Sequence, residues 1–240
     1  MLPPALGTLL ETLCDVPPKT PRALRQSVLN ANVTEGDLLP WADFDHPATD
    51  SYGRRLVHRG PRHEVMIMSW APGDVSAIHD HGQAAWGMVQ VFGDAEHAVF
   101  TLRGGVLSTL TRVHLEPGDI VELDRTTIHQ MGNPGRGRFL SLHIYMAQQD
   151  TQDITAGSRV FDTLRGETLH VDGGVFHRLD PAQIRRRRPG LAADARTELR
   201  DLTDRLSRAR RCGDTETARA ALERSRAQTL QQRLRDHAGR

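Results

Sequence analysis

The sequence is poor in lysine, cysteine and net charge, and each shortage excludes a class of protein. Lys19 is the only lysine among 31 basic residues, and 30 acidic residues balance them to a formal net charge of +1. A chain without excess charge has no overall signature of a nucleic-acid partner. The two cysteines, Cys14 and Cys212, are too few and too far apart for a disulfide framework or a zinc ribbon. A reducing cytosol is therefore the default compartment.

Long apolar runs are also missing. No stretch approaches the roughly 20 residues that a membrane-spanning helix needs. The first residues, "MLPPALGTLLETLCDVPPKT", contain neither a basic n-region nor a long apolar h-region, so we expect no signal peptide. The expectation is a cytoplasmic protein without a membrane partner, built as one large β domain or as one domain with an appendage.

Hydrophobic patterning divides the chain into three regions. Residues 1–50 predict helices packed on the next region, because Leu6, Leu9, Leu10 and Leu13 recur at helical spacing and prolines follow them. Residues 51–180 carry short apolar runs separated by Gly, Pro and Asp, which predicts a closed β-barrel or sandwich. Residues 181–240 predict a helical hairpin, with Leu199, Leu202 and Leu206 on one face.

The boundary before that hairpin holds four consecutive arginines, Arg185 to Arg188. Such a run could contact phosphate, but at a boundary between regions it is more typical of a solvated hinge. We therefore predict no nucleic-acid partner.

Two histidines with one residue between them stand out in "SAIHDHG". On an extended strand His79 and His81 point to the same face, and Asp80 points to the other. A third, His129, follows the turn and strand "EPGDIVELD". Three imidazoles from two segments can meet on one metal inside a barrel. The residues alone leave the ion open between iron, zinc, nickel and manganese.

Glycines frame these histidines in two longer motifs. The stretch from Gly73 to Gly93, "GDVSAIHDHGQAAWGMVQVFG", resembles the first motif of the cupins, and "GDIVELDRTTIHQMGN" resembles the second. The glutamate usual in the first motif is replaced by Trp86, and three-histidine cupins without it resemble thiol dioxygenases of the cysteine dioxygenase type. The resemblance implies a mainly β, jelly-roll-like cupin barrel with N-terminal helices and a C-terminal helical extension. It also implies Fe(II) held by His79, His81 and His129.

Two further segments agree with this resemblance. "SLHIY" is similar to the family's relay beside the iron, which implies catalytic roles for Ser141, His143 and Tyr145. "SYGRRLV" is similar to the segment that binds the substrate carboxylate, which places Arg54 in the anchoring position and Tyr52 beside it. Relatives that act on mercapto-acids usually have glutamine there, so Arg54 favours L-cysteine.

Departures from the family pattern leave alternatives open. Trp86 stands where animal enzymes have a crosslinked cysteine, and we expect it to contact the substrate pocket. The expected activity is addition of O2 to the sulfur of a small thiol to give a sulfinate. The alternatives are a biosynthetic cupin that oxidises a thiol further, a non-oxidative isomerase or lyase, and a ligand-sensing module. The partners are the thiol and O2, and a homo-oligomer is left open.

Overall fold

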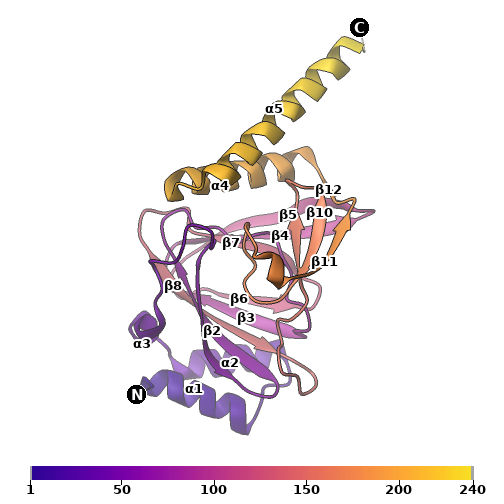
Figure 1. Cartoon of the computed structure of the whole chain (residues 1–240). Helices are drawn as coiled ribbons and strands as arrows, with labels where there is room; N and C mark the ends of the chain where they lie inside the picture. The colour runs from indigo at the N-terminus through magenta and orange to yellow at the C-terminus, as the bar shows by residue number, and fades with distance from the viewer. Residues whose placement is uncertain (1, 239–240) are drawn as a thin grey trace.

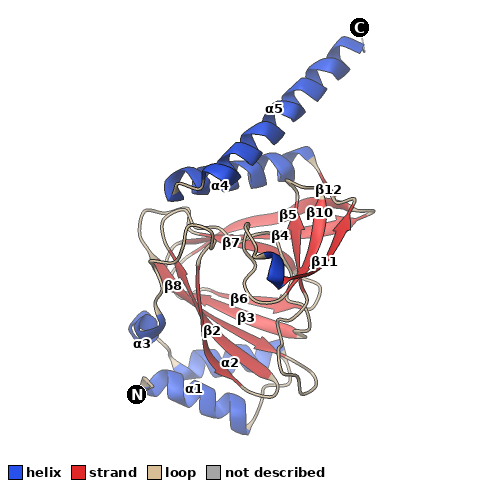
Figure 2. Ribbon diagram, in the orientation of Figure 1, coloured by secondary structure: helices blue, strands red, loops and turns tan. Residues whose placement is uncertain are grey.

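The chain forms two facing β-sheets with helices at both ends. The computed structural model describes residues 2–238, and the side chains through residue 227. Figure 1 follows the chain from the N-terminal helices below the sheets to the C-terminal helices above them, and Figure 2 separates strands from helices. The helices are α1 (Pro4–Asp15), α2 (Pro21–Ala31), α3 (Glu35–Leu38), α4 (Ala195–Cys212) and α5 (Thr215–Ala238), with 3-10 turns at Leu39–Trp41 and Pro181–Gln183.

The first of the facing sheets has five strands. Its strand order is β1-β2-β8-β3-β6. Residues alternate between its faces, so Met66 and Met68 face the interior between the sheets while Val65 and Ile67 face outward. Helices α1 and α2 cover the outer face, and the four leucines that predicted α1 are all buried. The bounds are β1 (Gly53–Arg59), β2 (His63–Trp70), β3 (Trp86–Val91), β6 (Ile120–Asp124) and β8 (Phe139–Met146).

The opposite wall is a second sheet of order β12-β5-β4-β7, flanked by a third of order β11-β10-β9. These strands are β4 (Ala95–Arg103), β5 (Val106–Leu115), β7 (Ile128–Gly132), β9 (Ser158–Asp162), β10 (Glu167–Val171), β11 (Ile184–Pro189) and β12 (Ala192–Ala193). An apolar cluster fills the space between the walls. The mainly β barrel with helices at both ends that the sequence predicts is confirmed.

The arginine run is a strand and not a hinge. Ile184–Pro189 forms β11, antiparallel to β10, with Arg188 opposite Thr168 and Arg186 opposite His170. Residues 181–240 are therefore not wholly a helical hairpin, since their first part belongs to the sheets. The physical reason is that β11 lies at an edge, where charged side chains stay in water and block further pairing. Its sequence consequently lacks the apolar alternation of a strand.

Helix α4 docks on the barrel through buried charge more than through leucines. Leu202 is buried, but Leu199 is 62% exposed. Arg205 is 2% exposed and donates from Nε to Asp201 and from Nη1 to Asp162, each at 3.0 Å. Arg208 donates from Nη1 to the carbonyl of Ala48 at 2.9 Å. Beyond α4, the helix α5 turns back and then projects away from the barrel (Figure 1).

Hydropathy along the helices agrees with the absence of long apolar runs. None of the helices within residues 2–238 combines the length and the apolar character needed to cross a lipid bilayer.

Candidate metal centre and substrate cavity

Backbone pairing brings two of the three motif histidines together. His79 lies in the segment between β2 and β3, and His129 lies in β7. Each donates its backbone N–H to the carbonyl of the other, both at 2.9 Å. His81 follows on the same side of this extended segment, whereas the carboxylate of Asp80 accepts a hydrogen bond from the backbone N–H of Arg159 at 2.7 Å. The Asp80 carboxylate is therefore held by Arg159 and not by the two histidines.

The three imidazoles converge on one point. Nε2 of His129 lies 3.1 Å from Nε2 of His79 and 2.9 Å from Nε2 of His81. Two nitrogens that bind one ion at about 2.1 Å and at right angles to each other lie roughly 3 Å apart, so these separations suit a shared cation. Nδ1 of His79 is held by the carbonyl of Ala77 at 2.8 Å, which puts its proton there and leaves the Nε2 lone pair facing the other rings. The donor set therefore fits a metal ion.

Burial keeps these rings neutral, as metal ligands must be. All three histidines are at most 6% exposed. Burial lowers the pKa of His79 to about 4, with partial compensation from the Ala77 carbonyl. Burial and the neighbouring histidines hold the pKa of His81 and of His129 well below 6.5.

A fourth histidine supports the cluster and carries no sequence motif. Nε2 of His97 lies 2.9 Å from Nδ1 of His129, inside the barrel. In the β4–β7 pairing His97 stands opposite Met131, diagonal to His129 and on the same face. A partner on the far nitrogen of a ligating histidine orients the ring and fixes its tautomer. Only the strand register, which is invisible in the sequence, reveals this contact.

Ser141, His143 and Tyr145 form a hydrogen-bonded chain along one face of β8. Nε1 of Trp70, which can only donate, reaches Oγ of Ser141 at 2.8 Å. Ser141 then has its own hydrogen for Nε2 of His143, also at 2.8 Å. Nδ1 of His143 lies 3.1 Å from the hydroxyl of Tyr145. The Tyr145 ring in turn lies tilted against the ring of His81, with centroids 5.0 Å apart. Trp70 is a further member of the chain that the motifs did not single out.

The surroundings of Tyr145 and His143 keep both side chains uncharged at neutral pH. Burial raises the pKa of Tyr145, and the nearby Tyr52 adds to the rise. Burial, together with the neighbouring His79 and the charge of Arg54, lowers the pKa of His143 to about 3. At neutral pH the phenol therefore keeps its proton and the imidazole stays neutral. The hydroxyl can donate into the cavity without first ionising.

One cavity joins these groups to the residues expected to bind substrate. Tyr52 and Arg54, from the start of β1, both line it. Arg54 has no carboxylate within ion-pair distance among the described residues, whereas the adjacent Arg55 points outward and pairs with Asp43 at 3.2 Å. Arg54 is thus a cation available to a ligand. Other lining residues are Met66, Met68, Thr155, Ser158 and Val175.

Trp86 does not reach this cavity, and the expectation that it contacts substrate is wrong. It pairs with Met146 in β8 and packs with the outer cluster beneath α1 and α2. Strand alternation explains the error, because Gly87, one residue on, faces inward opposite Tyr145. A Cβ at Gly87 would lie 2.9 Å from Cδ1 of the tyrosine ring. The residue beside the tyrosine is therefore Gly87.

Comparison with solved structures finds partial matches at low identity. A Thermus thermophilus protein is 17% identical, covering 46% of this chain and 94% of its own, with a TM-score of 0.38. A Klebsiella pneumoniae protein with a double-stranded β-helix domain is 18% identical, covering 48% and 90%, with a TM-score of 0.37. A cupin 2 conserved barrel domain protein from Salinispora arenicola is 20% identical, covering 44% and 85%, with a TM-score of 0.33.

The comparison with protein families is more specific. The family model for cysteine dioxygenase type I matches residues 24–155, which is more than half of the 240 residues. The matched range contains the three-histidine cluster, the relay on β8 and the start of β1. The chain therefore belongs to the cysteine dioxygenase type I family.

Proposed function

We propose that this protein is an iron(II)-dependent thiol dioxygenase that converts L-cysteine to its sulfinate. The observation that carries the proposal is the meeting of three features in one cavity: the three-histidine cluster, the Tyr145 hydroxyl and the guanidinium of Arg54. A non-oxidative metal cupin would need the histidines, but it has no evident use for the hydrogen-bonded chain behind Tyr145.

Iron(II) suits a neutral three-histidine set, which would be provided by His79, His81 and His129. When bound, the ion would supply Lewis acidity toward a thiol and the redox capacity to activate O2. The apolar wall formed by Met66, Met68 and Val175 would exclude bulk water from this chemistry.

Arg54 would hold the substrate carboxylate. A guanidinium pairs with a carboxylate through two parallel hydrogen bonds, which fixes orientation as well as position. Tyr52, stacked on Trp70 with centroids 4.8 Å apart, holds the wall next to Arg54 rigid. These contacts favour a short amino acid thiol over a thiol without a carboxylate.

Tyr145 would donate a hydrogen bond to the reacting sulfur or oxygen. His143 Nδ1–H, kept protonated by the serine on its other nitrogen, would donate to the phenol oxygen and orient it. We also propose a reducing cytoplasmic compartment, consistent with the free thiols of Cys14 and Cys212.

The test is O2 consumption by protein loaded anaerobically with iron(II), offered L-cysteine, cysteamine and 3-mercaptopropionate. We expect one O2 consumed per cysteine and a product heavier by two oxygen atoms, both derived from labelled O2. Zinc-loaded protein should consume none. The matched variants are Arg54→Gln and Arg55→Gln, neighbours on β1 of which only the first lines the cavity.

Arg54→Gln should lower kcat/KM for cysteine by about 10–100-fold, the value of a charge-assisted contact, and should affect cysteamine little. Arg55→Gln should leave both unchanged. Lack of O2 uptake with every thiol, despite bound iron, would refute the proposed activity. A product carrying more than two added oxygens would refute the sulfinate as its end point.

A further inference from the structure

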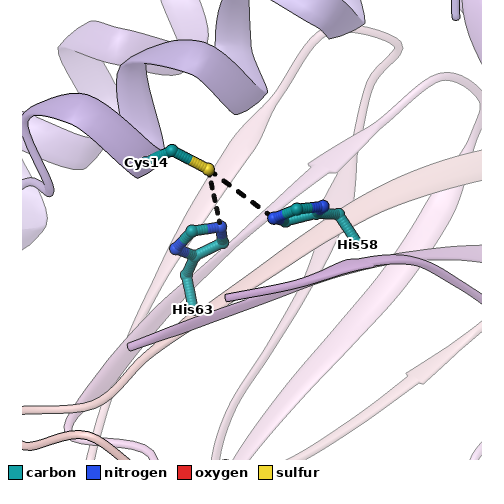
Figure 3. Close-up of side chains that lie close together, drawn as sticks. All are labelled: Cys14, His58 and His63. Carbon is teal, nitrogen blue, oxygen red and sulfur yellow. Dashed lines mark hydrogen bonds between the residues drawn. The ribbon is translucent and has the colours of Figure 1, made fainter. Parts of the chain in front are cut away.

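A second group of metal-ligating side chains lies on the outer face of the five-stranded sheet. Figure 3 shows Cys14 of α1 with its sulfur directed at the rings of His58, from β1, and His63, from β2. Sγ lies 3.6 Å from Nε2 of His58 and 3.9 Å from Nε2 of His63. The ligand atoms of all three residues lie within 4.8 Å of one another. Three segments of the chain thus bring one sulfur and two imidazoles together.

An irregularity in β1 places His58 in this group. The pairing of β1 with β2 shifts between Leu56 and His58, so that His58 stands opposite Val65. Val65 faces the outer cluster under α1. Regular pairing would have set His58 opposite Glu64, whose carboxylate is turned to the other face and accepts a hydrogen bond from the backbone N–H of Ile154. β-bulges are over-represented at sheet edges such as β1 and next to active sites, where they re-aim a side chain.

His63 is held rigidly in position. It is 1% exposed, and its ring lies against the backbone of Gly60, where a Cβ would come within 2.4 Å of Cε1. Its ring also stacks on that of His58, with centroids 5.1 Å apart and planes 19° apart.

The distances suit a tetrahedral zinc ion. With Zn–S of about 2.3 Å and Zn–N of about 2.1 Å, tetrahedral angles separate sulfur from nitrogen by about 3.6 Å. The two observed separations of 3.6 and 3.9 Å equal or slightly exceed that value. We propose that Cys14, His58 and His63 form a second metal site, distinct from the three-histidine centre, that binds Zn²⁺.

The proposed zinc site is partly open to solvent and lies beside two acidic residues. Cys14 is exposed and His58 partly so, which leaves the fourth position open to water or to an exchangeable ligand. Glu11 and Asp15, one turn before Cys14 and next to it, line the same surface hollow and add negative charge. Binding replaces the S–H proton of Cys14, released to solvent, by an S–Zn bond and involves no redox change. The ion would tie α1 to the β1–β2 hairpin.

Cobalt(II) distinguishes this site from the three-histidine centre. Only a site with a cysteine ligand gives the near-ultraviolet thiolate-to-cobalt charge-transfer band, and the other centre has no sulfur ligand. Metal-free protein titrated with Co²⁺ should develop this band, and added Zn²⁺ should abolish it. Zinc-saturated protein, freed of excess metal, should contain two ions per chain by mass spectrometry.

The variants are chosen so that only the proposed ligands change the result. Cys14→Ser and His58→Asn alter exposed or half-exposed side chains, so the fold should survive, as circular dichroism would verify. Each should weaken zinc binding at this site by more than about 100-fold. Loss of a residue that only hydrogen-bonds to a metal ligand would weaken binding by about 10–100-fold. Cys212→Ser, which removes the other cysteine, and His79→Ala should keep the band.

No band in the unmodified protein would overturn the proposal. So would a band that disappears in Cys212→Ser, or one that persists at full strength in Cys14→Ser. Because none of these readouts depends on turnover, a failed thiol dioxygenase assay would leave the proposed zinc site standing.

Discussion

Tyr145 and Trp86 lie on neighbouring strands, β8 and β3, but their side chains occupy opposite faces of the sheet. Trp86 is paired with Met146, one residue beyond the tyrosine, and shares the outer apolar cluster with it. Both residues were expected from the sequence to contact the substrate pocket. Given their positions, we expect substitution of Tyr145 to lower activity and substitution of Trp86 to leave it unchanged.

Tyr145→Phe removes the hydroxyl that His143 Nδ1 approaches at 3.1 Å and leaves the ring in place. If the hydroxyl donates to the reacting atoms, kcat should fall by about 100-fold or more while iron content is unchanged. Steady-state O2 uptake and metal analysis check this. Trp86→Phe is the control and should keep kcat, because the indole faces α1 and α2. Equal losses in both variants would contradict a donor role for the tyrosine and an outward position for the tryptophan.

His97 offers a second test at the level of one residue. His97→Asn should lower iron affinity by about 10–100-fold, because Nδ1 of His129 would lose the partner that orients its ring. Competition with a chelator measures the affinity. His114→Asn alters an exposed histidine at the end of β5 and should have no effect. Unchanged affinity in His97→Asn would show that the β7 backbone alone positions His129.

The sequence could predict the three convergent histidines but not their support. Glycine-framed motifs fix the spacing of His79, His81 and His129, and two-residue alternation orients the side chains on β8. His97 and Trp70 act through contacts across strands, so they depend on register. Trp86 was misplaced for the same reason, since a shift of one residue transfers a side chain to the other face.

Among the elements, α4 is the one whose packing the sequence predicted least well. Leucine spacing indicated an apolar face, yet the helix buries Arg205 against Asp162 and Asp201 and exposes Leu199. A charged residue is expected to face water unless a partner of opposite charge can be identified. The partner Asp162 lies on β9, far from Arg205 in the sequence, so the spacing within α4 could not reveal it. The edge strand β11 was missed for a related reason, because its arginines conceal a strand pattern.

Arg205→Met tests the buried ion pairs of α4. Removing the guanidinium leaves two buried carboxylates without their cation, so the free energy of unfolding should fall by about 3–5 kcal/mol. Urea denaturation at neutral pH measures the change. Arg210→Met, on the exposed side of the same helix, should change stability by less than about 0.5 kcal/mol. A small effect of Arg205→Met would mean that the carboxylates find other partners or take up protons.

At the scale of the whole molecule, the buried histidines make the fold sensitive to acid. Burial lowers the pKa of His79 and His97 to about 4, and that of His143 to about 3. In the unfolded chain each of these histidines regains a pKa near 6.5. Between pH 6.5 and about 4 the unfolded state therefore binds more protons than the folded state. His46 has the opposite sign: its burial is outweighed by Asp74, which raises its pKa, and its contribution is lost above 6.5.

The metal-free protein should therefore lose stability as the pH falls from 6.5 toward 4. Because several histidines share the window, the slope should exceed the roughly 1.4 kcal/mol per pH unit of one proton. Urea unfolding at half-unit steps of pH measures it. The carboxylates with lowered pKa values, such as Asp162, add their effect only below about pH 4. A flat profile between pH 6.5 and 4.5 would contradict the neutral, buried state of these rings.

The reciprocal backbone hydrogen bonds of His79 and His129 have a consequence for the metal-free state. Each ligand's main chain is tied to the other's at 2.9 Å, independently of what the side chains bind. Removing the ion should therefore leave the two ligands side by side. Their amide hydrogens should exchange with deuterated solvent as slowly before iron is added as after, and iron should enter a receptacle that is already assembled.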